Sequence, residues 1–346
     1  MILSLRSILL AATLSFTALL LPGCDRKEEA DADAPRVQYS GKDKVRSEVD
    51  AFLFKTRSYY NSSNFKALEN SMKEIREGEP VFANGSWKIF NFYDSLECAD
   101  SEKEGMWQLH ERIHKAWLAT YPDSITARIA YADFLVDYAW HARGYDYANT
   151  VTEEGWRLMK ERLAAAQRVL DEAKPMKPQC PMWWQVQLHI ALGQDWNHAD
   201  YGRVYNEAKS LFPKFWAYDC SLAHYLLPRW HGQPGDWEKA AAAGMQRPDG
   251  LGAEVYARVV VSQLGYYDNV FKETQASWPH TRDGMEAMRQ KYPESLQILN
   301  QYCKLAYLAG DRAKAQELYG QLKGYKDERV WDREDYANFQ TWVNAH

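Results

Sequence analysis

The chain has 346 residues, 46% of them hydrophobic and 26% charged, and a formal net charge of −5. This composition is typical of a globular protein and excludes wholesale disorder, a collagen-like repeat and a multi-span membrane protein. Nucleic-acid binding is not expected, because 42 Lys and Arg are balanced by 47 Asp and Glu without a basic cluster. Aromatic residues are abundant, with 14 Trp, 22 Tyr and 12 Phe.

Residues 1–23 have the pattern of a secretory signal peptide, with Arg6 ahead of an apolar run over residues 8–21. The run is too short and too weakly flanked to be a stable transmembrane helix. Its ending, Leu-Pro-Gly-Cys at 21–24, resembles the bacterial lipobox. The resemblance implies cleavage before Cys24 and acylation of its thiol. The alternative is an ordinary signal peptide followed by an incidental cysteine.

Residues 24–44 are polar and charged with no apolar period, which predicts a flexible tether ahead of a folded domain over residues 45–346. Two or three acyl chains on Cys24 would hold the protein at a membrane, whereas one chain binds only marginally. Asp25 resembles the residue that retains enterobacterial lipoproteins in the inner membrane. We therefore expect a lipid-anchored protein of the bacterial cell envelope that faces the periplasm, in the inner rather than the outer membrane.

Four cysteines follow the anchor, at Cys98, Cys180, Cys220 and Cys303. An even number in an oxidising compartment permits two disulfides, in any of three connectivities. The alternative is that all four are free thiols, buried as small hydrophobic residues. Because no pair has the spacing Cys-x-x-Cys, neither a redox motif nor a zinc knuckle is expected. No metal or other cofactor is predicted.

The first segment with a catalytic pattern is His-Glu-Arg-Ile-His at 110–114, which fits H-E-x-x-H. On a helix this spacing places two imidazoles on one side, where they can bind zinc. The charged Arg112 and Lys115 argue against the buried helix of a zinc protease, and no third ligand follows at the expected distance. We interpret His110 and His114 as chance neighbours on a solvated helix face, and we do not predict an enzyme.

From about residue 45 onward, apolar residues recur every three or four positions, which predicts helices almost throughout. One such helix carries apolar residues over 127–138, and the next carries a stripe from Trp156 to Ala173. The near copies Tyr-Pro-Asp-Ser at 121–124 and Tyr-Pro-Glu-Ser at 292–295 place proline and a capping serine ahead of such runs. They predict the starts of related helical hairpins.

Two predicted turns combine tryptophan with arginine. Residues 138–144 end one helix, with Gly144 as its left-handed cap. Residues 225–237 end another in a turn rich in Pro and Gly, after which Asp236 is expected to cap the next helix. Flat rings stack on sugars or peptide planes and arginine binds carboxylates. We predict a binding surface made of Trp140, Arg143, Arg229, Trp230, His231, Asp236 and Trp237.

The alternative interpretation of these two turns is structural. The tryptophans would then fill the joints between hairpins, and Arg229 would bind the carbonyl groups at a helix end.

The clearest repeat unit lies at 299–319, where an apolar helix, a Gly-Asp turn and a second helix follow one another. This unit resembles a tetratricopeptide repeat, in which the small Ala315 and the large Tyr319 would interlock with the first helix. Other units are irregular in length. The sequence therefore predicts an all-α fold of irregular tetratricopeptide-like helical hairpins, similar to an α-solenoid.

Four segments together resemble a bacterial family of uncharacterised proteins that carry a domain of unknown function with tetratricopeptide-like helices. They are Tyr-Ala-Trp-His-Ala-Arg-Gly at 138–144, the helix start at 151–156, Leu-Leu-Pro-Arg-Trp-His-Gly-Gln-Pro-Gly-Asp-Trp at 226–237, and the repeat around 309–311. The resemblance covers about residues 48–345. It implies a helical-repeat fold and supplies no reaction, substrate or catalytic residue.

The expected function is therefore that of an envelope lipoprotein whose helical domain binds a protein or peptide partner along a concave, aromatic-lined surface. The chain lacks a Gly-rich phosphate loop, a Gly-x-Ser-x-Gly elbow and the Ser-x-x-Lys pattern. The alternative function is binding or processing of envelope glycan or peptidoglycan, with Trp140, Trp230 and Trp237 stacked on sugar rings.

Overall fold

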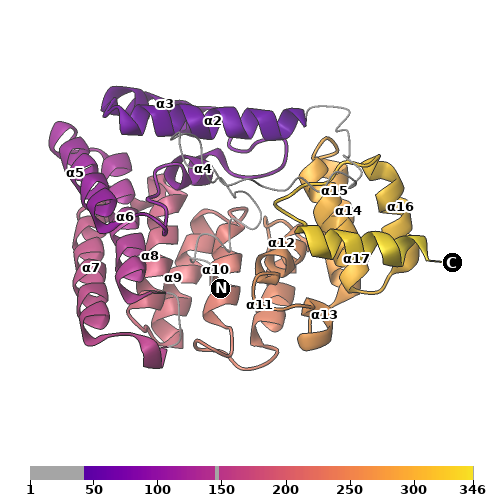
Figure 1. Cartoon of the computed structure of the whole chain (residues 1–346). Coiled ribbons are helices and arrows are strands. Elements are labelled where there is room, and N and C mark those ends of the chain that lie inside the picture. Colours follow the sequence, from indigo (N-terminus) through magenta and orange to yellow (C-terminus); the bar gives the residue numbers. More distant parts are fainter. Residues whose placement is uncertain (1–42, 145–147, 346) are drawn as a thin grey trace, which may run out of the picture.

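The computed structural model describes residues 43–144 and 148–345, and these ranges contain sixteen α-helices and no β-strand (Figure 1). A single isolated β-bridge joins Val81 to Trp87. The prediction of an all-α fold is confirmed. The predicted signal peptide, Cys24 and all of the predicted tether before Asp43 lie outside the described residues. None of the described helices is both long and apolar enough to cross a membrane.

Most of the chain forms antiparallel helix pairs arranged in a row (Figure 1). We call the more deeply buried member of each pair the central helix and the other the flanking helix. The central helices are α6 (Ile125–Arg143), α8 (Pro181–Gly193), α10 (Ala217–Tyr225), α12 (Ala253–Gln263) and α15 (Leu296–Leu308). The flanking helices are α7 (Glu153–Glu172), α9 (His198–Leu211), α11 (Asp236–Met245), α14 (Trp278–Lys291) and α16 (Arg312–Leu322). Helix α5 (Glu104–Thr120) precedes the row, and α17 (Arg333–Asn344) follows it.

The two kinds of helix differ in sequence as their positions require. In α8 every residue from Pro181 to Leu192 is buried, including the polar Gln185, Gln187 and His189, so the helix is surrounded on all sides. By contrast, α7 buries one stripe that includes Met159 and Leu163 and exposes its other side. The prediction that Trp156 belongs to this buried stripe is wrong. Trp156 lies in the first turn of α7 and is 42% exposed.

Three turns that lead into central helices have nearly the same backbone conformation. The residue that caps the carboxyl end of α5, α9 and α14 is Tyr121, Phe212 and Tyr292, respectively. The φ and ψ angles of these residues are −127° and 69°, −130° and 66°, and −126° and 61°. A proline follows each of these residues. Ser124 and Ser295 then accept a hydrogen bond from the backbone three residues later. The predicted starts of related hairpins at 121–124 and 292–295 are confirmed.

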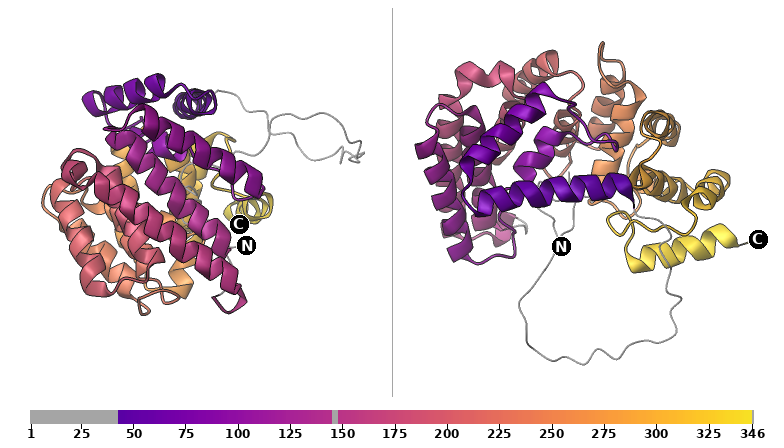
Figure 2. Two further views of the ribbon diagram at one scale, coloured as in Figure 1. Left: turned by 90° about the vertical axis from the view of Figure 1, so that its left-hand side faces the viewer. Right: turned by 90° about the horizontal axis from the view of Figure 1, so that it is seen from above.

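The amino-terminal part of the described chain forms a layer across one side of the row. Helices α2 (Lys44–Asn61) and α3 (Phe65–Glu77) lie along the top of Figure 1, and Figure 2 shows α2 crossing over the row from above. The short α4 (Lys88–Asp94) lies beneath them. The remaining short helices are η1 (Ala148–Thr150), η2 (Lys174–Gln179) and α13 (Val270–Glu273).

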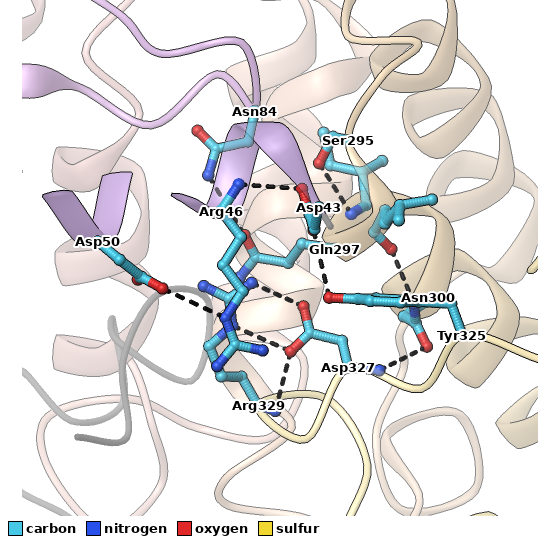
Figure 3. A network of polar contacts seen from close by, with 12 residues as sticks. Asp43, Arg46, Asp50, Asn84, Ser295, Gln297, Asn300, Tyr325, Asp327 and Arg329 are labelled. Atoms are coloured by element: carbon cyan, nitrogen blue, oxygen red, sulfur yellow. Dashed lines mark hydrogen bonds and ion pairs between the residues drawn. The ribbon is translucent and has the colours of Figure 1, made fainter. Parts of the chain in front are cut away.

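Polar contacts join the start of α2 to the carboxyl-terminal helix pairs (Figure 3). The Tyr325 hydroxyl donates to Oδ2 of Asp43 at 3.3 Å. The fully buried Asp327 accepts from the Arg329 guanidinium at 2.7 Å, and its backbone N–H donates to Oδ1 of Asn300 at 3.2 Å. The two ends of the described chain are therefore held together by side chains that are 282 positions apart.

Candidate functional site

The chain's own residues 79–98, which we call the inserted segment, cover the amino-terminal ends of the central helices. The segment begins as a small hairpin, in which Val81 bridges Trp87 and the Gly85 backbone N–H donates to the carbonyl oxygen of Phe82. It continues into α4, where every residue from Ile89 to Asp94 is buried. This part of the row therefore offers no open groove.

The tip of the hairpin lies in a slot formed by α10, α12, α14 and α15. The Gly85 carbonyl oxygen accepts hydrogen bonds from Nε1 of Trp216 at 3.4 Å and Nη2 of Arg258 at 3.3 Å. Asn84 donates from Nδ2 to Oε1 of Gln297 at 3.4 Å. Gly85 has a φ of 74°, and a Cβ atom there would lie 2.5 Å from the Tyr292 ring. Only a glycine fits this position.

The two tryptophan- and arginine-rich turns come together at the opposite ends of the central helices. The Trp140 and Trp230 rings meet edge to face, with centroids 5.7 Å apart. The Arg143 guanidinium carbon lies 5.5 Å from the Trp140 ring centre and 5.1 Å from that of Trp156. A surface therefore joins the end of α6 to the turn after α10.

Two further residues extend this surface toward the turn after α12. The His224 ring lies 5.6 Å from that of Trp230, and the Tyr266 hydroxyl lies 2.5 Å from Nδ1 of His224. The Arg229 guanidinium carbon lies 4.4 Å from the Tyr266 ring centre. We call this continuous set of side chains the turn strip. It consists of Trp156, Arg143, Trp140, Trp230, His224, Tyr266 and Arg229.

The structure brings together four of the seven residues predicted for the binding surface and separates the other three. His231 stacks on Tyr225 with a centroid separation of 4.3 Å, and its Nε2 lies 3.4 Å from Oδ1 of Asp195, away from Trp230. Trp237 is 1% exposed, so it is a core residue, in agreement with the structural alternative. Asp236 is not the cap, because α11 begins at Asp236 itself and the cap position is held by Gly235 with a φ of 94°.

Sequence reasoning missed three members of the turn strip. Trp156 was assigned to a buried stripe because its spacing fits, but its side chain is 42% exposed at the start of α7. His224 lies in the last turn of α10 and Tyr266 in the turn after α12, and no short-range pattern links residues 42 positions apart. A signal was present in Ala-His-Tyr at 223–225, where a polar residue interrupts an apolar helix end.

Three buried nitrogen atoms of the turn strip have no hydrogen-bond partner among the described residues: Nε1 of Trp140, Nε1 of Trp230 and Nε2 of His224. Burial lowers the pKa of His224 to about 3, so its ring is neutral at physiological pH. Burial also raises the pKa of Tyr266, whose hydroxyl keeps its proton and donates to Nδ1 of His224. The ring proton of His224 is therefore assigned to Nε2, and all three atoms are N–H donors.

The two histidines of the H-E-x-x-H pattern are buried, so the interpretation of a solvated helix face is wrong. His110 is 6% exposed and His114 is 1% exposed, because α2 covers this side of α5. The Tyr60 hydroxyl lies 3.2 Å from Nδ1 of His110, and the Phe134 ring lies 5.0 Å from His114. Burial lowers the pKa of His110 to about 4. In the described part of the chain, no three His, Cys, Asp or Glu side chains are placed to hold a metal ion.

The four cysteines after the anchor are all buried free thiols in the structure, which favours the second of the two interpretations of them. Burial raises the pKa of Cys98, Cys220 and Cys303 to about 12, and it also raises the pKa of Cys180. A thiolate is the reactive form of cysteine, so none of these residues is an activated nucleophile.

Comparisons with protein families, with curated proteins and with solved structures found no match for this chain.

Proposed function

We propose that this protein is a lipid-anchored protein of the bacterial envelope, held by Cys24, whose helical domain binds a protein or peptide partner through the turn strip. The observation that carries the proposal is the continuity of this strip, in which rings and guanidinium groups from three turns touch in sequence. Trp156, at one end, is 42% exposed, and Arg229, at the other end, is exposed. Aromatic residues and arginine dominate the binding energy of protein interfaces.

The proposed binding surface differs from the concave side that the sequence predicts. That side is covered by the hairpin and α4, so a partner would have to displace buried residues such as Phe92, which is completely buried. In the turn strip, Trp156 and Arg229 are exposed and can be reached without such displacement. We therefore assign partner binding to the turns and not to the amino-terminal ends of the central helices.

A protein partner is favoured over a glycan by the way in which the rings are arranged. Stacking on a sugar needs an open ring face. In the turn strip, the Arg143 guanidinium lies over both Trp140 and Trp156, and the edge of one indole meets the face of another between Trp140 and Trp230. Guanidinium groups on aromatic rings are typical of sites that bind carboxylates and peptide groups.

Site-specific photo-crosslinking in living cells tests the proposed surface. A benzophenone side chain replaces Trp156 in the full chain, and the matched control places it at Leu211, which is 43% exposed at the end of α9. We expect a discrete cross-linked product from position 156 and none from position 211. Equal or absent products at both positions would contradict the proposal.

The anchor is tested separately by replacing Cys24 with serine. The unaltered protein should sediment with membranes and incorporate labelled palmitate, whereas the Cys24→Ser variant should do neither. Palmitate incorporation into the variant would overturn the assignment of Cys24 as the lipid attachment site.

A further inference from the structure

The tip of the hairpin in the inserted segment contains Asn84-Gly85, the only Asn-Gly dipeptide in the sequence. In an unconstrained chain this dipeptide is especially prone to deamidation, because glycine places no side chain between its backbone nitrogen and the asparagine side chain. The Gly85 nitrogen attacks Cγ of Asn84 and expels the side-chain nitrogen as ammonia. Water then opens the resulting succinimide to aspartate or isoaspartate.

The docked hairpin engages both reacting groups. The Gly85 N–H donates to the carbonyl oxygen of Phe82 at 2.8 Å, so its nitrogen is held away from attack. Oδ1 of Asn84 accepts from the backbone N–H of Ser86 at 3.0 Å, and Nδ2 donates to Oε1 of Gln297 at 3.4 Å. Asn84 is 7% exposed, so little water reaches its amide. In this geometry the succinimide cannot form without a movement of the tip.

The contacts that hold the tip in its slot come from distant helices. Gln297 belongs to α15, and the Gly85 carbonyl oxygen accepts from Trp216, which precedes α10, and from Arg258 in α12. These three hydrogen bonds measure 3.3 to 3.4 Å, which is long for an N–H donor and an oxygen acceptor. Several weak contacts therefore hold the tip, and their joint loss would free the Asn-Gly dipeptide.

We propose that Asn84 is a modification site controlled by docking of the hairpin: it deamidates when the tip is out of the slot and is inert when the tip is docked. The isoaspartyl product has one more backbone atom between residues 84 and 85. The Gly85 carbonyl oxygen would then no longer meet Trp216 and Arg258, so the tip could not return to the slot. Deamidation therefore marks the chains whose inserted segment has failed to close.

The experiment compares the full-length protein in detergent micelles with the same protein unfolded in guanidinium chloride, both at pH 8. Peptide mass spectrometry measures deamidation at residue 84, and a carboxyl methyltransferase specific for isoaspartate detects that product. We expect deamidation to be at least about a hundredfold slower in the native protein, because it requires local opening. The variant Asn84→Gln should give no product at this position. Equal rates in the native and unfolded protein would overturn the proposal.

One pair of variants separates opening of the slot from general destabilisation. Trp216→Phe keeps a ring but deletes a donor to the tip, so it should speed deamidation of the native protein about fivefold, as expected for one hydrogen bond. Trp117→Phe is the matched control, because it deletes a buried indole donor to Glu69, between α5 and α3. It should leave the rate unchanged. Equal acceleration in both variants would contradict control by the slot.

The consequence of the modification is tested by refolding. Protein that has partly deamidated while unfolded is returned to native conditions and treated briefly with a protease. Chains with isoaspartate at residue 84 should be cleaved within the inserted segment, whereas chains that retain Asn84 should be resistant. Isoaspartate in the resistant fraction, at the same proportion as before proteolysis, would show that the modified tip still docks and would overturn the marking role.

Discussion

Arg258 donates a hydrogen bond at 3.3 Å to the carbonyl oxygen of Gly85, which lies 173 positions earlier in the chain. The same guanidinium pairs with Glu254 at 2.8 Å, and both side chains are buried. Because the glutamate balances the charge, the guanidinium can be buried against a backbone carbonyl. This contact fixes the position of the inserted segment on the row of helices.

Replacing Gly85 with alanine should strongly destabilise the protein. The new Cβ atom would lie 2.4 Å from Nη2 of Arg258, and the alanine would have to adopt a φ of 74°. Gly310 has the same φ of 74° with no atom within 4 Å, so Gly310→Ala measures the cost of the backbone conformation alone. In urea unfolding, we expect Gly310→Ala to lower the free energy of unfolding by about 1–2 kcal/mol. Gly85→Ala should lower it by at least about 2 kcal/mol more. Equal losses of unfolding free energy in the two variants would show that the side chains around Gly85 move to accommodate the extra methyl group.

The two tryptophans at the starts of α7 and α11 should respond differently to truncation. Trp237→Ala removes a side chain that is 1% exposed, so it should lower the free energy of unfolding by about 3–5 kcal/mol. Trp156→Ala removes a side chain that is 42% exposed and should change it by no more than about 1 kcal/mol. Thermal unfolding of the two variants provides the comparison. A large loss for Trp156→Ala would assign this residue to the core.

The stability of the protein should fall as the pH drops from about 6.5 to 4, in part because of His110. In the unfolded chain its imidazole binds a proton near pH 6.5, whereas burial lowers the pKa to about 4 in the folded state. The stabilisation is therefore fully present above pH 6.5 and is lost as the pH falls through this window.

The variant His110→Gln should reduce the difference in unfolding free energy between pH 7.5 and pH 4.5 by about 2–3 kcal/mol. The readout is this difference and not the absolute stability, which the substitution itself changes. His280→Gln serves as the control, because His280 is exposed on α14. An unchanged pH dependence in His110→Gln would contradict the assigned shift.

The four buried thiols should be inert until the protein unfolds. At pH 8, iodoacetamide should leave Cys98, Cys180, Cys220 and Cys303 unmodified in the native protein, because their raised pKa values suppress the thiolate. After denaturation without a reductant, all four should be alkylated, as measured by intact mass. Alkylation that requires a reductant would demonstrate disulfides instead.

Local features were predictable from the sequence because their causes lie within a few residues. Ser124 and Ser295 cap helices through their own hydroxyl groups, and Gly144 ends α6 with a φ of 77°. Apolar periodicity also predicted helices almost throughout, but not that α6 and α8 are buried on nearly all sides. The two turns do come together in the structure, because the Trp140 and Trp230 rings meet across 90 positions of sequence.

Features that depend on distant segments could not be predicted in the same way. His110 and His114 have charged neighbours in sequence, and they are buried because α2 and α6 pack over them. Trp237 follows a turn typical of binding loops, yet it is a core residue. In sequence, the inserted segment does not differ from the other apolar segments of the chain. Its position in the fold depends on contacts with the distant Trp216 and Arg258. Periodicity predicts that a segment is helical and has an apolar face, but not which distant segments cover its other residues.

The inserted segment also determines the order in which the protein can fold. A chain synthesised from its amino terminus presents Phe82 to Leu96 well before Arg258 and Gln297, which hold the hairpin tip from 173 and 213 positions away. Repeat proteins with contacts only between neighbours can fold progressively as each unit emerges. Here α2 and α3 can pack on α5 soon after they are made. The hairpin tip, by contrast, cannot be fixed until α12 and α15 have been made, so the inserted segment is completed last.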